Sequence, residues 1–448
     1  MFAHIDMNSY FASVEQQANP HLRGRPLGVC TYLHKVGCVI AASIEAKQCG
    51  VKVGMSMEEA KRVCPQMKFV QNDPPKYRAV TSKIFALFHE MTDKVEHYSI
   101  DEAFLDLTGW YRDEAEAAWA LCRARLRIQK EIGEWLRCSI GIAPSKFLSK
   151  LASEMHKPNG LTIINQDNLD ACLATRELED ACGIGKRIHR HLNKLGIYTL
   201  LDLKNYPVGN LIRALGVQGY YWHERLHGRE IDRFQNSTSS VVPCALYDHV
   251  PKTIGHSFCV PRRANDQNLI LPILIRLTER AGRRLRSFNH YTRALNIRVS
   301  LGNDVEFRTR DSRSQNDISW GVGRVMTVKF AEPVNDPFSL IHAACRALEQ
   351  MWQGEPVIFL AVTLLDFVPP NGQLRATFPP SPSRRRRACL RTNDDLRELE
   401  KYERTTHAID TIRDRHGHES IIFASMLGLS SDYAPDRIGF RKTEGVEL

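Results

Sequence analysis

The sequence predicts a mixed α/β protein with two separate sheet domains, and two patterns carry this prediction. Apolar strands and helical segments alternate over residues 1–10 and 77–165, as in a sheet covered by helices. Residues 254–366 then read as strand, helix, strand, strand, helix, strand, which is the order of a ferredoxin-like fold. Residues 166–232, between the two, are mostly helical with short loops. A chain of 448 residues has room for about three domains.

In the first domain, the apolar run 2–7 predicts a strand that ends in acidic and polar residues. Residues 11–76 read as an insertion, in which Ser43 to Cys49 form a short helix closed by Gly50. Prolines at positions 74 and 75 suit the first turn of a helix. The other expected elements are helices at 74–94, about 113–135 and 145–156, and strands within 96–107 and at 137–142 and 160–164.

In the second domain, apolar periodicity predicts long helices at about 266–288 and 337–353. Residues 369–392 are rich in Pro, Ser and Arg, which predicts a linker. A helical pattern at about 394–416 follows.

Charge and cysteine usage narrow the class of protein. Lys and Arg total 61 against 51 Asp and Glu, a net charge of +10, which favours a polyanionic partner such as nucleic acid. Ten of the basic residues and only two acidic ones fall between Lys252 and Arg298. The 12 cysteines include no C-x-x-C pair, so we expect neither a disulfide framework nor a zinc ribbon. The longest apolar run, 357–365, is too short to span a membrane. The N-terminus lacks the pattern of a secretory signal, and a cytoplasmic location is expected.

Three acidic residues are the candidate catalytic group. Asp6 ends the first predicted strand, and Asp101 and Glu102 lie at the tip of a predicted hairpin. If the hairpin lies beside the first strand, the three carboxylates converge. Close carboxylates repel unless cations lie between them, and Mg²⁺ is the usual partner of oxygen ligands beside phosphates. The alternative to a metal site is that Asp6 only caps the end of a strand and that Asp101 and Glu102 form an ordinary polar turn.

Two motifs around these acids resemble the Y-family of translesion DNA polymerases, the relatives of UmuC and DinB. They are Ile5-Asp6-Met7-Asn8-Ser9-Tyr10-Phe11-Ala12-Ser13-Val14-Glu15 and Tyr98-Ser99-Ile100-Asp101-Glu102-Ala103-Phe104. Further similarity lies in residues 139–143, in Lys146 and Lys150, in 157–160 and in 183–186, and it runs in order to about residue 368. Some stretches resemble the UmuC branch and others the DinB branch, so the branch stays open.

The resemblance implies a right-hand polymerase with four domains. The palm would be residues 1–10 and 77–165, the fingers 11–76, the thumb 166–232 with a helix-hairpin-helix, and the little finger a ferredoxin-like domain at 240–368. Residues 369–448 would be a linker and tail.

It also implies a DNA-directed DNA polymerase of low fidelity that uses two Mg²⁺ ions to join a dNTP to a primer 3′-hydroxyl on template DNA. Asp6, Asp101 and Glu102 match the metal-binding carboxylates, and the backbone carbonyl of Met7 matches another ligand.

The nucleotide pocket is expected around the start of the helix that follows Asp6. Phe11 matches the steric gate, an aromatic ring that excludes the 2′-hydroxyl of a ribonucleotide; the alternative is an ordinary core Phe. Backbone N–H groups of Tyr10 and Phe11 at a helix N-terminus suit a triphosphate. Lys47, where the family usually has Arg, and Lys157 match residues that neutralise the triphosphate.

Three further segments are expected to bind DNA or a partner protein. A helix-hairpin-helix motif is matched by Gly183, Gly185 and Lys186. The alternative is an ordinary turn between two helices. Arg280, Arg283 and Arg284 on one long helix suit sequence-independent phosphate contacts, unless they are simply solvated. Gln373, Leu374 and Phe378 resemble a peptide that binds the sliding clamp, and Arg384–Arg387 follow it. An accessory subunit like UmuD is a further possible partner.

Two other classes fit parts of the pattern. A non-catalytic DNA-binding relative that acts as a scaffold at damaged DNA would lack the three acids, all of which are present here. A nucleotide cyclase shares a palm-like domain, but the helix-hairpin-helix and the basic second sheet domain argue against it.

Overall fold

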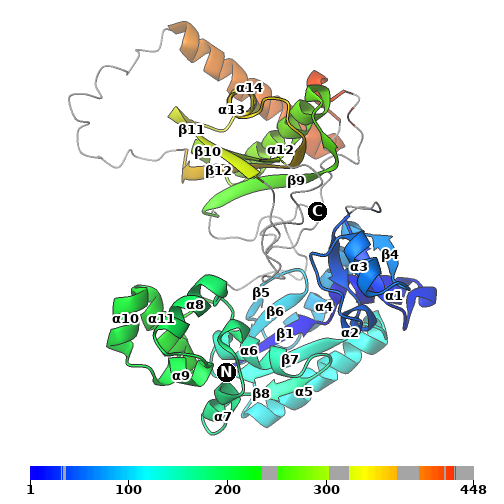
Figure 1. Cartoon of the computed structure of the whole chain (residues 1–448), viewed down its shortest axis with the longest axis vertical. Coiled ribbons are helices and arrows are strands. Elements are labelled where there is room, and N and C mark those ends of the chain that lie inside the picture. Colours follow the sequence, from blue (N-terminus) through cyan, green and yellow to red (C-terminus); the bar gives the residue numbers. More distant parts are fainter. Residues whose placement is uncertain are drawn as a thin grey trace. The chain divides into compact units, whose positions relative to one another are not determined.

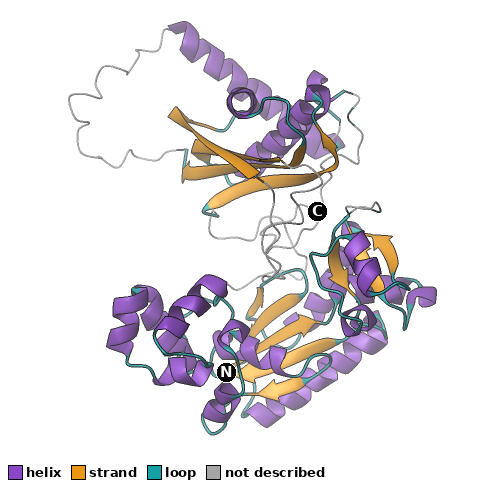
Figure 2. Ribbon diagram, in the orientation of Figure 1, coloured by secondary structure: helices purple, strands orange, loops and turns teal. Residues whose placement is uncertain are grey.

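The first strand of the chain lies at the centre of a five-stranded sheet (Figure 2). β1 (Phe2–Met7) pairs antiparallel with β6 (Glu102–Asp106) on one side and with β7 (Cys138–Ala143) on the other. β5 (Val95–His97) extends the sheet beyond β6, and β8 (Leu161–Ile163) runs parallel to β7 at the other edge. Segments about 100 and 140 positions apart therefore meet beside β1, as the hairpin prediction requires.

The two faces of this sheet have different roles. Alternate residues of β1 point to opposite faces, and Ala3 and Ile5 belong to a large apolar core with residues of α4 (Pro74–His89) and α5 (Glu114–Arg127). On the other face, His4 lies 2.7 Å from the Ser153 hydroxyl of α6 (Lys146–Met155). Asp6 shares this second face with His4, since the two residues are two positions apart on the strand.

Helix α6 lies unusually close to β7 because position 141 has no side chain. A Cβ atom on Gly141 would lie 2.0 Å from the carbonyl oxygen of Ser149 and 2.4 Å from the backbone nitrogen of Ser153. Both are backbone atoms of α6, so they cannot move aside as a flexible side chain would. The distance of α6 from the sheet therefore depends on this glycine.

The predicted insertion forms a small sheet of its own, ordered β3-β2-β4. β2 (Leu27–Cys30) lies between β3 (Val39–Ala42) and β4 (Lys68–Gln71). α2 (Ile44–Gln48) and α3 (Met57–Val63) accompany this sheet. A separate small core, which includes Cys30, Ala46 and Cys64, holds these pieces together.

A group of short helices follows the main sheet (Figure 1). Leu192, Leu200, Leu211 and Trp222 belong to its apolar core, which continues into α6 through Phe147 and Leu151. Its helices are α7 (Leu169–Ala174), η3 (Leu178–Asp180), α8 (Lys186–Lys194), α9 (Leu200–Asn205), α10 (Val208–Leu215) and α11 (Val217–Leu226).

The second unit is a four-stranded sheet with helices packed against it. Its elements follow the expected order of strand, helix, strand, strand, helix, strand, and the sheet order is β11-β10-β12-β9, with all three ladders antiparallel. The predicted ferredoxin-like fold has this element order but places its first and third strands at the centre of the sheet, whereas here the second and fourth strands, β10 and β12, lie there. The elements are β9 (Thr253–Ala264), α12 (Gln267–Ser287), β10 (Tyr291–Leu301), β11 (Val322–Val334), α13 (Pro337–Met351) and β12 (Val357–Val368).

A C-terminal segment packs against the helices of this second unit. It comprises α14 (Asn393–His416) and η6 (Ala424–Met426). Phe338 of α13 stacks on Tyr402 with ring centroids 5.0 Å apart, and Arg413 forms a buried ion pair with Glu279 of α12. The segment predicted as a closing helix is thus part of the packed unit.

The computed structural model describes residues 1–31, 33, 37–234, 251–301, 322–370, 393–417, 420–427 and 429. The contacts divide the described residues into two units, one within Met1–Leu246 and one within Tyr247–Asp436. Within the described ranges, no helix has the length and apolar character needed to cross a membrane. Most predicted elements are found within a few residues of their expected bounds; the helix expected at 74–94 ends earlier, at His89.

Candidate active site

Asp6 and Glu102 are directly opposite each other in the β1–β6 ladder. Opposed side chains of an antiparallel pair stand on the same face of the sheet, so the two carboxylates share one site. The backbone N–H of Met7 donates to the carbonyl oxygen of Asp101 at 2.9 Å, which holds the hairpin tip against the end of β1. The predicted meeting of these segments is therefore present.

The charges at this site influence one another. Burial, together with the charges of Glu102 and Asp101, raises the pKa of Asp6 to about 7, although Lys157 acts in the opposite direction. Burial also raises the pKa of Asp101, and Glu102 adds to this, while the Ser99 hydroxyl donates to the Asp101 carboxylate and opposes it. The three acids are thus close enough for mutual repulsion to be felt.

Glu102 has the opposite balance. Burial disfavours its charge, but the His4 ring, whose Nε2 lies 3.5 Å from Glu102, and the charge of Lys150 outweigh burial and lower the pKa of Glu102 to about 2. At neutral pH the site therefore holds at least one firmly ionised carboxylate beside two that burial makes harder to ionise.

Three lysines bring positive charge to this face of the sheet. Two of them are one turn apart on α6, and the third follows that helix. Each ammonium group reaches a carboxylate of a different strand, so the three ion pairs run across the sheet. The pairs are Lys146–Glu96 at 2.5 Å, Lys150–Glu102 at 2.6 Å and Lys157–Asp6 at 2.8 Å.

Two residues that support the site were not identified from the sequence. His4 is completely buried between Ser153 and Glu102, and burial lowers its pKa to about 4. Asn8 accepts a hydrogen bond from the backbone N–H of Asn159 at 2.7 Å, which ties the loop of Lys157 to the end of β1. The spacing of His4 and Asp6 on one strand face is the sequence signal that could have found His4.

Lys47 and Lys157 come from different elements but lie near each other. Lys47 is on α2 of the small sheet, and Lys157 follows α6. Burial and the charge of Lys157 lower the pKa of Lys47, while Asp6 raises it. Two lysine side chains thus flank the acidic site, an arrangement that suits a polyphosphate ligand.

Phe11 lies flat against Tyr77. The ring centroids are 4.4 Å apart, the rings are nearly parallel, and Phe11 is 8% exposed. Tyr77 is fixed in turn because its hydroxyl donates to Glu15 at 2.9 Å. The orientation of the Phe11 ring is therefore determined by a buried neighbour.

Tyr10 and Phe11 occupy the first turn of α1 (Tyr10–Ala18). The N–H groups of a first helical turn have no partner within the helix. Ser9, just before the helix, has a left-handed backbone with φ of 50°, which makes the turn from β1 sharp. The Tyr10 hydroxyl is buried and bonded to Tyr77 and Thr81, so only its backbone is available to a ligand.

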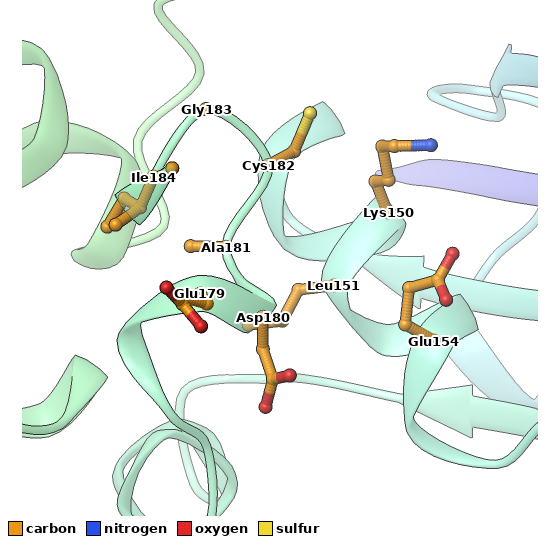
Figure 3. Close-up of a pocket in the computed structure, with 10 residues that line it drawn as sticks. Lys150, Leu151, Glu154, Glu179, Asp180, Ala181, Cys182, Gly183 and Ile184 are labelled. Carbon is orange, nitrogen blue, oxygen red and sulfur yellow. The ribbon is translucent and has the colours of Figure 1, made fainter. Parts of the chain in front are cut away.

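A pocket of about 460 Å³ lies between α6 and the turn that precedes α8 (Figure 3). Gly183, with a φ of +103°, and Gly185 line this pocket, and Lys150 lines its opposite wall. Trp222 packs behind Gly183, where a Cβ atom would meet its ring at 3.2 Å. Lys186 is the first residue of α8. The backbone at this turn thus faces a cavity whose lining also includes Glu154, Glu179 and Asp180.

The predicted DNA-binding arginines of α12 lie on the helical side of the second unit. Arg283 pairs with Asp414 of α14 at 2.7 Å, and Arg284 is half-buried. Arg286 makes two bonds to Asp410, at 2.6 and 2.9 Å. Acidic residues of the C-terminal segment therefore neutralise part of the positive charge of α12, which the sequence analysis had assigned to DNA binding. Arg280 is on the same helix.

The predicted clamp-binding residues Gln373, Leu374 and Phe378 lie outside the described residues, as do Arg384–Arg387.

The donor set of the acidic site fits a divalent metal ion. Across the described residues, no three side chains of His, Cys, Asp or Glu are gathered tightly enough to hold an ion by themselves. Asp6 and Asp101 are, however, buried carboxylates whose pKa values are raised, and a divalent cation would relieve their repulsion. Lys157 contacts Asp6 and Lys150 contacts Glu102, and these ammonium groups would have to release the carboxylate oxygens to a bound ion.

Comparison with known proteins identifies relatives along most of the chain. Residues 5–154 match the model of the impB/mucB/samB family, and residues 251–376 match the C-terminal domain of the same family. A DNA polymerase IV of Pelotomaculum thermopropionicum is 30% identical over 94% of this chain and 94% of its own length. A DNA polymerase IV of Moorella thermoacetica is 32% identical over 93% of each chain.

Solved structures agree with the fold. A Y-family DNA polymerase chimera of Dbh and Dpo4 superposes with a TM-score of 0.66 at 24% identity, covering 82% of this chain and 99% of the other. An insertion ternary complex of Dbh DNA polymerase, also 24% identical, gives 0.52 over 82% and 99%. The expected right-hand polymerase fold is thereby confirmed. The matches at both sheet domains, and the relatives that span nearly the whole chain, place this protein in the impB/mucB/samB family as a Y-family DNA-directed DNA polymerase of translesion synthesis.

Proposed function

We propose that Asp6, Asp101 and Glu102 form the catalytic centre of nucleotidyl transfer, with a dNTP and primer–template DNA as substrates. The observation that carries this proposal is the direct pairing of Asp6 with Glu102 beside the buried carboxylate of Asp101. A solved relative described as an insertion ternary complex supports the substrates.

Members of this family depend on metal ions, and the three carboxylates with the carbonyl of Met7 would hold two Mg²⁺ ions. When bound, such ions would offset the negative charge of the phosphates and lower the pKa of the attacking 3′-hydroxyl. The residues of the chain would fix the ligand oxygens: His4 orients Glu102, and the hydrogen bond of Met7 to Asp101 fixes the hairpin tip.

Lys47, Lys157 and the first turn of α1 would bind the triphosphate. Lys157 is within 2.8 Å of Asp6, so its ammonium group can move from this carboxylate to a phosphate oxygen with a small shift of the side chain. The N–H groups of Tyr10 and Phe11 would add hydrogen bonds. Phe11, held flat by Tyr77, would exclude a 2′-hydroxyl by contact alone.

The experiment is primer extension by the Asp101→Ala variant, with DNA binding measured in parallel. Removing one carboxylate should abolish extension on intact and damaged templates and leave the Kd for DNA nearly unchanged, because carboxylates do not bind phosphates. Asp93→Ala, at a carboxylate outside the cluster, is the control. Equal loss of extension and of DNA binding would contradict the catalytic assignment, and full extension by Asp101→Ala would favour the scaffold alternative.

In the second unit, two surfaces are candidates for DNA. Sequence suggested the arginines of α12, of which Arg283 is paired with Asp414. The other candidate is the sheet face opposite the helices, where Arg298 of β10 and Lys329 of β11 are exposed. Small residues such as Ser257 and Ala361 pair beside Arg298 and would let a phosphate backbone approach. We favour the sheet face.

Salt dependence distinguishes the two surfaces. Each lost phosphate contact lowers the slope of log K against log[salt] by about 1. The double variant Arg298→Ala/Lys329→Ala should lower this slope, whereas Arg283→Ala should not. If Arg283→Ala lowers the slope and the double variant does not, α12 is the surface that contacts DNA.

The finer division of the chain rests on the same reasoning. We propose a palm of residues 1–10 and 77–165, fingers of 11–76, a thumb of 166–232 and a little finger of 240–368. Gly183, Gly185 and Lys186 would bind a DNA phosphate from the thumb. The clamp-binding peptide and a UmuD-like subunit stay predictions of the sequence.

A further inference from the structure

Two histidines lie side by side on the last helix of the thumb region, away from the acidic site. His223 is on α11, and His227 is the residue that caps the helix. They are four positions apart, which places them on one side of the helix. Their ring centroids are 4.1 Å apart, with a tilt of 32° between the rings. The side chain of His223 is 19% exposed, so an ion from solvent can reach the pair.

Hydrogen bonds determine which nitrogen of each ring carries the proton. Nδ1 of His227 lies 2.7 Å from the backbone carbonyl oxygen of His223, which can only accept, so this Nδ1 is a donor. Nδ1 of His223 lies 3.2 Å from a carboxylate oxygen of Glu224 and is a donor by the same argument. In each neutral ring the Nε2 nitrogen therefore carries the lone pair.

The Nδ1 contacts of the two rings are of the kind that metal-binding histidines make. A ligating imidazole usually donates its other N–H to a carboxylate or a backbone carbonyl, which fixes the ring and raises its basicity. Here one ring has the carboxylate and its neighbour has the carbonyl. No described residue hydrogen-bonds to either Nε2 atom, so both lone pairs are available on adjacent rings.

The residues between them make a sequence string that reads His-Glu-Arg-Leu-His. In helical metalloproteases the glutamate of such a string is the general base. Glu224 cannot take that role here because it is 6% exposed and both of its oxygens accept from Nη1 of Arg229, at 2.9 and 2.8 Å. The geometry thus favours ion binding without hydrolysis.

We propose that His223 and His227 form a bidentate site for a transition-metal ion of the kind that prefers imidazole nitrogen, such as Ni²⁺, Cu²⁺ or Zn²⁺. Mg²⁺, which prefers oxygen ligands, would not compete for it. Among the described residues no third His, Cys, Asp or Glu completes the site, so water or an external donor would fill the other positions. The ion would join the last turn of α11 to the residue that caps it.

The test is a calorimetric titration of the full-length protein with NiCl₂ in excess Mg²⁺, which saturates the carboxylates of the acidic site. His223→Ala and His227→Ala should each weaken one Ni²⁺ site by about tenfold or more. His191→Ala removes an exposed histidine of the neighbouring helix α8 and should leave this site unchanged. Circular dichroism with EDTA checks that every variant is folded.

Electron paramagnetic resonance with one equivalent of Cu²⁺ gives an independent readout. The wild-type spectrum should show coupling to two imidazole nitrogens, and each single variant should show coupling to one. The proposal is overturned if the two variants bind Ni²⁺ as the wild type does, or if the Cu²⁺ spectrum of the wild type shows no coupling to a pair of nitrogens.

Discussion

The ammonium group of Lys157 lies 2.8 Å from Oδ2 of Asp6, although 151 positions separate the two residues. The same ammonium group contacts Glu154, one turn earlier in the chain. Burial opposes the charge of Lys157, but these two carboxylates outweigh it and raise the pKa of Lys157. A lysine held in this way remains a cation at every pH at which the protein is expected to work.

This contact gives a prediction about nucleotide binding. Lys157→Gln should raise KM for the incoming dNTP by about tenfold or more, because a hydrogen bond to a charged group contributes about 1.5–3 kcal/mol. The Kd for DNA should stay the same. Steady-state kinetics of single-nucleotide insertion measures KM and a DNA-binding titration measures Kd, with the exposed Lys130→Gln as the control. An unchanged KM would remove Lys157 from the triphosphate site.

Sugar selection should depend on the stacked pair of Phe11 and Tyr77. Phe11→Ala removes the ring that meets a 2′-hydroxyl and should lower discrimination against ribonucleotides by about 10- to 100-fold, the equivalent of about 1–3 kcal/mol of steric overlap. Tyr77→Phe keeps the stacked ring and loses only the bond to Glu15, so it should discriminate as the wild type does. If Phe11→Ala also selects deoxynucleotides normally, another residue is the gate.

A third prediction concerns stability and pH. Burial, with a smaller contribution from the charge of His89, lowers the pKa of His97 to about 4, and its ring stacks on Phe85 with centroids 4.3 Å apart. The unfolded chain, with an ordinary pKa near 6.5, binds a proton first as the pH falls. Stability contributed by neutral His97 is therefore present above pH 6.5 and is lost between about 6.5 and 4, by up to about 3 kcal/mol.

Urea unfolding of wild type and His97→Gln across this pH range measures the effect. The difference in free energy of unfolding between the two proteins should shrink as the pH falls from about 6.5 to 4. A difference that does not vary with pH would show that His97 titrates alike in the folded and unfolded states.

The sequence predicted the acidic site better than it predicted the role of the α12 arginines. Asp6, Asp101 and Glu102 lie at strand ends, and strand pairing is enough to bring them together. The partners of Arg283 and Arg286 are on α14, more than 120 positions away, and no local period indicates which surface a distant helix covers. His4 was missed although its position two residues before Asp6 places both side chains on one face of the strand.

The buried pair of Arg413 and Glu279 supports the attachment of the C-terminal segment. Arg413→Met leaves the carboxylate of Glu279 buried without a partner and should destabilise the second unit by about 3–5 kcal/mol. The double variant Arg413→Met/Glu279→Gln should recover part of this loss. Chemical denaturation measures both variants, and the exposed Arg415→Met should change the free energy of unfolding by less than about 0.5 kcal/mol. A single variant as stable as the wild type would contradict this account.

The absence of a side chain at Gly141 has a consequence for how the protein can vary. Lys146 and Lys150 reach their carboxylates only because α6, which carries them, packs directly against the backbone of β7 at Gly141. One added methyl group would lift that helix and draw two ammonium groups away from the acids at once. The smallest possible change in the strand, at a residue that pairs with His4, would therefore act as a substitution of both lysines.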